Sequence, residues 1–278
     1  MMLKPILLEK LVKKILFVGT AITVFILFFI IFYILKNGLA VIDMEFLLSS
    51  PKDLGRAGGI FPCIVGTIVL SLIAILIATP LGVGAAIYLT EYTRKGRLIS
   101  IIRFFTECLS GIPSIIFGLF GFVLFVVYLG FGWSILSGGL TTAFMLLPTI
   151  IRTSEEAIKA VPDYYREVSL SLGGTKWQTI VKVVLPSALP GIATGIILGI
   201  ARSIEETAVV IFTAGSVLHL PTSLFDSCRT MSVHFYILAR EGISMENAYG
   251  TAAVLIITIL LINMFAYWLM HRLIAKYS

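Results

Sequence analysis

The longest uncharged run of the sequence, 108–151, sets the strongest limit on what this chain can fold into. It contains 44 residues without an Asp, Glu, Lys or Arg. A single straight helix of that length would extend about 66 Å, whereas the hydrocarbon core of a bilayer is about 30 Å thick. The run must therefore turn, and the glycines that flank Trp133 favour a turn there. We predict two membrane spans joined near Trp133.

Five further uncharged runs extend this pattern along the chain. They occupy 15–35, 57–90, 183–201, 207–225 and 247–270. Charged residues make up only 13% of the sequence, against about 25% in an average soluble domain. We predict an all-α polytopic membrane protein with six transmembrane helices, at about 14–36, 63–89, 105–128, 136–153, 188–212 and 247–270. A seventh span over 207–225 is the less favoured alternative, because His219 and Pro221 interrupt that run.

The Lys and Arg residues are distributed unevenly between the two sides of this arrangement. With the N-terminus inside, fifteen fall on inner segments, five on outer segments and one, Arg202, within a span. Cytoplasmic loops normally carry such an excess of positive charge. We therefore predict a multi-pass protein of the cell membrane, with cytoplasmic termini at 1–13 and 271–278 and a transmembrane domain at 14–270. The net charge of +6 then reflects topology, and we predict no nucleic-acid partner.

A polar segment, 154–187, separates the fourth and fifth spans on the predicted inner side. Gly173-Gly174 is typical of the end of a first helix. Thr175 and Gln178 have the spacing of a capping box, which starts a second helix, and Leu185-Pro186 is expected to end it. We predict a helix–glycine–helix elbow with one apolar face free to dock another protein.

The same segment carries a spaced motif. Glu167-Val168-Ser169 is followed after three residues by Gly173, then after nine by Val183, one residue and Leu185-Pro186. This pattern resembles the coupling motif of ABC-importer permeases, usually summarised as EAA-x3-G-x9-I-x-LP. The resemblance implies a type I importer permease whose elbow seats in a groove of a cytoplasmic ATPase and passes on its closing motion. The coupling residues that it implies are Glu167, Gly173, Gly174, Leu185 and Pro186.

Other segments are similar to one group of importers. Residues 199–215 look like the ARAIGETAPLLFTAG segment of phosphate-uptake permeases, and 111–121, 220–226 and 231–239 look like their PstA-type subunit. One departure is Glu205, which stands where that family usually has Gly. The resemblance implies a permease subunit of an ATP-driven phosphate importer. Besides membrane lipid, it implies three protein partners. These are a second permease of PstC type, a cytoplasmic dimer of PstB-type ATP-binding subunits and an extracytoplasmic PstS-type phosphate-binding protein.

Arg202, Glu205 and Glu206 form the only strongly charged cluster within a predicted span. A charge at the centre of a membrane helix costs about 2.5–3.5 kcal/mol on insertion scales, so the cluster needs an explanation. Arg202 precedes the two glutamates by three and four residues, which is the spacing of ion pairs on one helix. One interpretation is a structural ion pair. The other is a lining of the translocation path, in which Arg202 offers phosphate a planar fork of donors.

Signatures of catalysis and of metal binding are missing from the sequence. It contains no Walker A pattern, catalytic triad or dinucleotide fingerprint, and its three histidines are scattered. We therefore predict no enzyme activity, no metal and no cofactor, with ATP hydrolysis in a separate subunit. Two alternatives stay open. The chain could serve an importer of another oxyanion, such as phosphonate, molybdate or sulfate, or it could be a channel or secondary transporter without an ATPase.

Two smaller features add expectations about packing. Gly191, Gly195 and Gly199 recur every four residues, which favours close helix packing within the chain over contact with a second permease. Cys63 and Cys228 both fall near the predicted outer face. A disulfide between them is therefore open, although two free thiols are favoured. Whether two permeases assemble as a heterodimer or a homodimer is also open.

Overall fold

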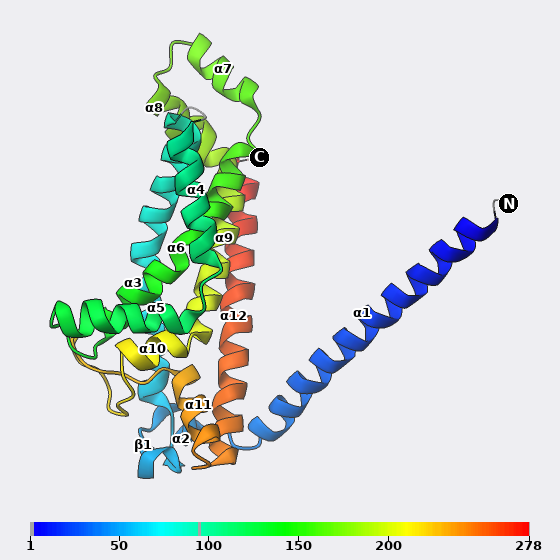
Figure 1. Ribbon diagram of the computed structural model, residues 1–278. Coiled ribbons are helices and arrows are strands. Elements are labelled where there is room, and N and C mark those ends of the chain that lie inside the picture. Colours follow the sequence, from blue (N-terminus) through cyan, green and yellow to red (C-terminus); the bar gives the residue numbers. More distant parts are fainter. Residues whose placement is uncertain (1–2, 94–95, 278) are drawn as a thin grey trace.

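The computed structural model describes residues 3–93 and 96–277 and is almost entirely helical (Figure 1). Within these residues, five helices are long and apolar enough to cross a membrane, and a sixth span results when one bent helix pair is counted as a single span. The predicted all-α polytopic fold is confirmed. Arg94 and Lys95, which the charge argument counts on the inner side, lie outside the described residues, as do 1–2 and 278 of the predicted termini.

The elements follow one another along the chain with only two short strands among them. The helices are α1 (Leu3–Gly38), α2 (Met44–Leu48), α3 (Phe61–Ile87), α4 (Arg97–Ser110), α5 (Ser114–Gly121), α6 (Ile135–Lys159), α7 (Asp163–Ser171), α8 (Lys176–Thr179), α9 (Leu185–Glu205), α10 (Ala208–Thr213), α11 (Met231–Arg240) and α12 (Met245–Tyr277). A 3-10 turn, η1 (Asp53–Gly55), joins β1 (Pro51–Lys52) to β2 (Ala57–Gly58), which pair antiparallel. The structure also has three π-helical turns. Turn η2 (Tyr88–Tyr92) extends α3, η3 (Phe122–Tyr128) extends α5, and η4 (Ile180–Val184) precedes α9.

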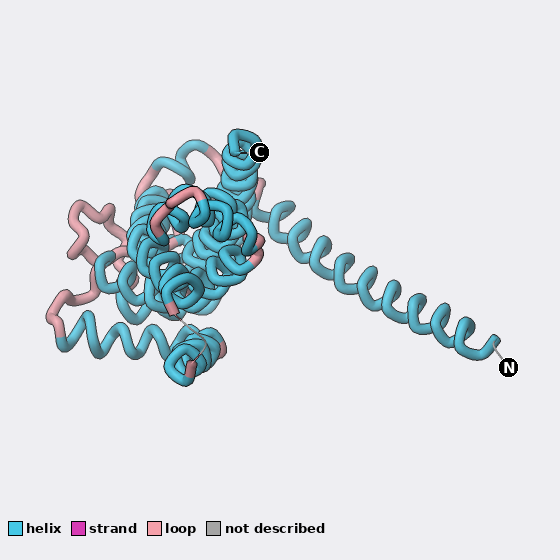
Figure 2. Tube along the Cα trace, turned by 90° about the horizontal axis from the view of Figure 1, so that it is seen from above, coloured by secondary structure: helices cyan, strands magenta, loops and turns pink. Residues whose placement is uncertain are grey.

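Helix α1 stands apart from the rest of the molecule. It projects from the bundle in both views (Figures 1 and 2), and its apolar residues are exposed along most of its length. Only its C-terminal end packs, where the ring of Tyr33 lies 5.8 Å from that of Tyr249 on α12. A helix that is apolar on all sides and unpaired in the single chain is suited to a hydrocarbon environment.

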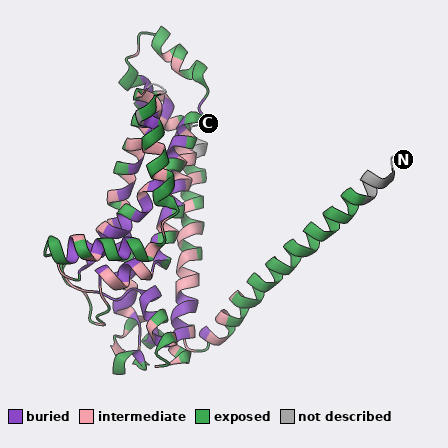
Figure 3. Cartoon of the chain, viewed as in Figure 1, coloured by how far each residue is buried: buried purple, intermediate pink, exposed green. Residues whose placement is uncertain are grey.

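Helices α3, α6 and α9 form the core of the bundle, where buried side chains concentrate (Figure 3). Leu146 and Ile150 of α6 are fully buried in one cluster with Ala74 and Ala78 of α3. Small residues on α3 bring the two backbones close together, which is typical of membrane helix pairs. This core fixes the positions of the elements that carry the predicted sites.

The glycines of α9 face α6 of the same chain. A Cβ atom placed on Gly191 would collide with Ala157, and one placed on Gly195 would collide with Thr153. These contacts confirm the prediction that the glycine repeat serves packing within the chain.

The predicted third span, 105–128, is not one straight helix. The axes of 99–110 and 114–128 differ by 100°, so that α5 lies across the bundle in Figure 1. The break falls at Gly111-Ile112-Pro113, because Pro113 lacks a backbone N–H and has an extended ψ of 139°. The α4 and α5 segments therefore count as one span only as a bent pair.

The predicted boundaries around the fifth span are wrong at both ends. Leu185-Pro186 does not end the elbow helix, which continues through η4 into α9 as one helix from Lys176 to Glu205. The wider π-helical turn η4 comes directly before Pro186 and accommodates a residue without a backbone N–H. At the other end, Glu206 is extended and breaks the helix. Only the six-residue α10 follows, so 207–225 contains no seventh span.

The end of the molecule opposite α7 is built from short elements. In Figure 1, α2, β1 and α11 gather there, whereas the C-terminal part of α12 lies toward α7. The Met231 amide donates to Thr67 Oγ1 at 2.9 Å, which ties the start of α11 to α3. Cys63 and Cys228 are buried and free, so the favoured expectation of two thiols is confirmed.

Candidate functional site

The predicted elbow consists of α7 and α8 joined by a turn at Gly173-Gly174. Gly173 has a φ of +82°, a conformation that glycine adopts without strain, and the space around its Cα is open. A Cβ on Gly174 would meet the Ser169 carbonyl oxygen at 2.8 Å. The predicted capping box is present, since the Thr175 amide donates to Gln178 Oε1 at 2.9 Å and the Gln178 amide donates to Thr175 Oγ1 at 3.3 Å.

The surface of this elbow exposes several large apolar side chains. Leu172 is 84% exposed and Trp177 is 61% exposed, and Val168 and Leu170 are also exposed beside them. Figure 3 shows α7 largely in the colour of exposed residues. Side chains of this size in open contact with water mark an interaction surface. Glu167, the first predicted coupling residue, is exposed on the same helix.

The last two predicted coupling residues lie apart from this surface. Leu185 and Pro186 are partly buried at the start of α9, below the elbow. Leu185 packs against the buried cluster that contains Ile158, Val184 and Ala188. The structure therefore places Glu167 and the two glycines on the elbow, and the Leu-Pro pair within the spanning helix that continues from it.

The predicted charge cluster is split by the end of α9. Arg202 and Glu205 are exposed on the face that also carries Leu198. Glu206 is 8% exposed, and its Oε1 accepts from the Val209 amide at 3.3 Å, next to the N-terminus of α10. Among the described residues, no carboxylate lies within ion-pair distance of Arg202.

One of the two interpretations of this cluster, an ion pair between Arg202 and the glutamates, is therefore absent among the described residues. The helix stops at Glu205, so Glu206 leaves the i, i+4 position and turns toward α10 instead. Glu206 stabilises the start of α10 with its negative charge. The guanidinium of Arg202 is exposed.

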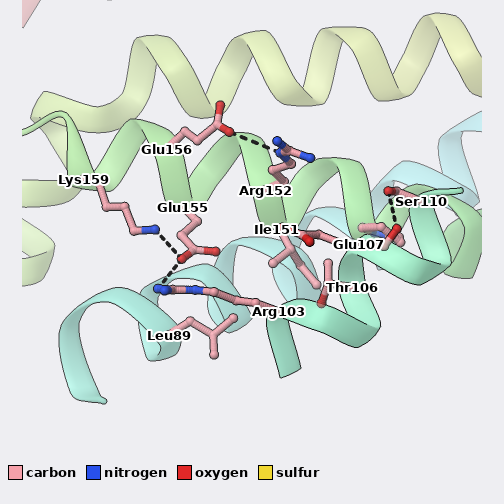
Figure 4. Close-up of a pocket in the computed structure, with 11 residues that line it drawn as sticks. Leu89, Arg103, Thr106, Glu107, Ser110, Ile151, Arg152, Glu155, Glu156 and Lys159 are labelled. Carbon is pink, nitrogen blue, oxygen red and sulfur yellow. Dashed lines mark hydrogen bonds and ion pairs between the residues drawn. The ribbon is translucent and has the colours of Figure 1, made fainter. Parts of the chain in front are cut away.

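A charged pocket between α4 and α6 was not among the predicted sites (Figure 4). Glu155 Oε1 lies 2.5 Å from Arg103 Nη2 and 2.6 Å from Lys159 Nζ, while Arg152 Nε lies 3.2 Å from Glu156 Oε1. The pocket has a volume of about 150 Å³ and contains three cations and three carboxylates. Its charges balance, and the pair between Arg103 and Glu155 joins α4 to α6.

Sequence reasoning could have found only part of this network. Glu155 and Lys159 are four residues apart on one helix, which is a recognisable spacing. The contact from Arg103 joins helices that are distant in sequence and has no local signal.

Comparison with known proteins places the chain in a family. Residues 78–278 match the family model described as "Binding-protein-dependent transport system inner membrane component". The chain is 34% identical to the probable ABC transporter permease protein YqgI of Bacillus subtilis over 253 residues, covering 85% of this chain and 86% of that protein. It is 31% identical to the phosphate transport system permease protein PstA of Pasteurella multocida, covering 93% and 92% of the two chains.

A further relative and two solved structures agree with this result. The phosphate transport system permease protein PstA 1 of Mycobacterium tuberculosis strain H37Rv is 37% identical, covering 76% of this chain and 69% of that protein. A bacterial ABC transporter involved in alginate import matches with a TM-score of 0.69 at 18% identity, covering 96% and 98% of the chains. The MetNI methionine transporter matches with a TM-score of 0.65, covering 77% and 95%. The chain therefore belongs to the family of binding-protein-dependent transport system inner membrane components, as a permease of ABC importer type with PstA proteins among its relatives.

Proposed function

We propose that this chain is the transmembrane permease subunit of an ATP-driven importer of inorganic phosphate. The observation that carries the proposal is the exposed guanidinium of Arg202 on a spanning helix, in a chain whose relatives include phosphate permeases. An arginine offers a tetrahedral oxyanion two parallel N–H donors. Arg202 lies on the outward face of α9, where the translocation path would run between this chain and a second permease.

Glu205 has a role of its own in this proposal. It lies three residues from Arg202 on the same helix and is exposed beside it. A lone arginine would hold a phosphate too long for rapid transport, and a neighbouring carboxylate weakens that hold by repulsion. Glu206 has a structural role, because its carboxylate is engaged with α10.

The energy for transport would come from outside the chain. The elbow formed by α7 and α8, on the cytoplasmic side, would dock in a dimer of PstB-type ATP-binding subunits through its apolar surface around Leu172 and Trp177. Closure of the ATPases would displace the elbow and, through η4, the helix α9 that carries Arg202. A PstC-type permease and an external PstS-type binding protein would complete the assembly.

Uptake of radiolabelled phosphate by reconstituted vesicles tests this function. The vesicles contain the full complex with its binding protein, and sulfate, molybdate and phosphonate are added as competitors. ATP-dependent phosphate uptake that the competitors leave unchanged is the expected result. Transport of a competitor in place of phosphate would assign a different oxyanion. Uptake without ATP, with no ATPase copurifying with the tagged chain, would instead indicate a channel or secondary transporter.

A further inference from the structure

Both arms of the elbow contact the π-helical turn η2 at the end of α3. Glu91 of this turn pairs with Arg166 on α7, and the ring of Tyr92 lies 5.0 Å from Lys176 Nζ at the start of α8. The paired residues Glu91 and Arg166 are 75 positions apart in the sequence. Helix α3 is thus connected to the elbow by side chains, whereas α9 is connected to it by an unbroken backbone.

All five N–H donors of Arg166 are engaged. Its Nε and Nη2 both donate to Glu91 Oε1, at 3.0 and 2.7 Å. Its Nη2 also donates to the Ile158 carbonyl at 3.0 Å, and its Nη1 donates to the Val161 carbonyl at 2.8 Å. One side chain therefore joins α7 to the end of α3 and to the end of α6.

The pair is largely shielded from water. The side chain of Arg166 is 18% exposed and that of Glu91 is 9% exposed. Charge-assisted hydrogen bonds of this kind are short and strongly directional, so they resist separation of the parts that they join. A third partner, Asp163, lies 3.2 Å from Arg166 Nη1 but is 91% exposed. Water screens that contact, which makes it weak by comparison.

The elbow itself is held together as one unit. The hydroxyl groups of Ser169 on α7 and Thr179 on α8 are 2.8 Å apart, and Gly174 packs directly on the Ser169 carbonyl. A force applied to either arm would therefore move both arms together. The question is how that movement reaches α3, which forms the core of the bundle with α6 and α9.

We propose that the Glu91–Arg166 pair transmits the displacement of the elbow to α3, so that α3 and α9 move together during transport. The proposal rests on the proposed function, because it needs an ATPase that drives the elbow. Both helices meet the elbow through a π-helical turn, η2 on α3 and η4 before α9. Without the pair, the displacement would act on α9 alone. Glu91 and Arg166 are positioning residues, and neither needs to contact the transported solute.

The test measures how much solute is transported for each ATP hydrolysed. The complete complex is purified with Glu91→Gln, Arg166→Gln, the double variant or Asp163→Asn, and each preparation is reconstituted at equal amounts of assembled complex. The expected result is that each single Gln variant hydrolyses ATP but transports at least about tenfold less solute per ATP. Asp163→Asn removes only the exposed partner of the same arginine and should stay within about twofold of the unmodified complex.

The double variant separates coupling from other roles of the two residues. If the pair acts as a unit, Glu91→Gln with Arg166→Gln is no worse than the more damaging single variant. Additive losses would mean that the residues act separately, and an unchanged ratio of transport to hydrolysis in both single variants would overturn the proposal. An unmodified complex that fails to transport phosphate with ATP speaks against the proposed function instead, so the two failures are distinguishable.

A distance measurement covers the case in which the variants do not assemble. Spin labels at Tyr88→Cys on η2 and Tyr164→Cys on α7 occupy exposed positions that are not among the docking residues named above, in a chain with Cys108→Ser because Cys108 is the exposed native thiol. We expect the distance between the labels to change by less than about 2 Å between nucleotide-free and ATP-bound complexes, a small helix shift. A larger separation would show that the elbow moves without α3 and would overturn the proposal.

Discussion

Arg166 and Arg202 occupy opposite electrostatic situations in the same chain. Arg166 pairs with a buried carboxylate and donates to two backbone carbonyls, whereas Arg202 is exposed and has no described carboxylate within ion-pair distance. An arginine whose donors are all engaged fixes the elements around it. An arginine with free donors on a membrane helix is costly to keep, and such residues commonly mark the path of a solute or ion.

Replacement of Arg202 should have the largest effect on transport. In the proposed path, Arg202→Ala would remove two charge-assisted bonds to the anion, so we expect phosphate uptake to fall by about 100-fold or more. The temperature of unfolding should barely change, because Arg202 is exposed and no ion pair among the described residues is lost. Uptake and thermal unfolding are measured on the same reconstituted complex, and Arg202→Lys serves as the charge-preserving control. Normal uptake by the Ala variant would remove Arg202 from the path.

Replacement of Arg166 should instead lower the stability of the protein. Arg166→Ala leaves Glu91 buried without its counter-charge, a loss that typically costs about 3–5 kcal/mol. The unfolding temperature of the purified protein should drop clearly. Glu91→Leu combined with Arg166→Met should recover part of the loss, since no buried charge then remains. An Arg166→Ala variant as stable as Arg202→Ala would contradict the distinction between the two arginines.

Substitution of Gly173 tests whether the elbow differs in function from another turn whose glycine also has a positive φ. Gly173 and Gly242 have φ values of +82° and +63°, and a Cβ on either would meet nothing within 4 Å. Substitution by Val should therefore cost about 1–2 kcal/mol of backbone strain at both positions. We expect Gly173→Val to reduce ATP-driven uptake about tenfold, because a docked subunit would meet the new side chain. Gly242→Val, at the other end of the molecule, is the matched control. Equal uptake by both variants would contradict a docking role for the elbow.

The parts of the molecule that the sequence predicted well obey local rules. The apolar spans, five straight helices and one bent pair, follow from composition. The elbow follows from the capping box and from Gly173, whose positive φ suits a glycine. The glycine repeat of α9 also predicts close packing by spacing alone. In each case the signal lies within a few residues of the structure that it specifies.

The parts that could not be predicted depend on contacts between distant segments. Glu91 and Arg166 are 75 positions apart in the sequence, so their contact has no local signal. Pro113 marks where the third span bends, but α5 is held across the bundle by α10, whose backbone packs against Gly118. The extended backbone at Glu206 is likewise fixed from outside, because its carbonyl accepts from Ser232 Oγ at 2.8 Å.

Arg229 sharpens the comparison because it is buried and, among the described residues, has no carboxylate within ion-pair distance, as is true of Arg202. Its Nε donates to the Ser216 carbonyl at 2.8 Å, and its Nη1 lies 3.4 Å from His234 Nδ1. Burial, and then the charge of Arg229, lower the pKa of His234 from 6.5 to about 4. The histidine is therefore neutral in the folded protein at neutral pH, beside the guanidinium of Arg229.

The stability of this region should consequently depend on pH with a definite sign. The unfolded chain takes up a proton at His234 near pH 6.5, whereas the folded chain resists it down to about pH 4. The free energy of unfolding is therefore highest above pH 6.5, and it declines as the pH falls toward 4 because the unfolded chain binds the proton more readily. We expect the unfolding temperature to decrease by several degrees over this window. His234→Gln keeps a polar side chain that does not titrate and should weaken the dependence. A variant with the same pH profile as the unmodified chain would mean that other groups are responsible.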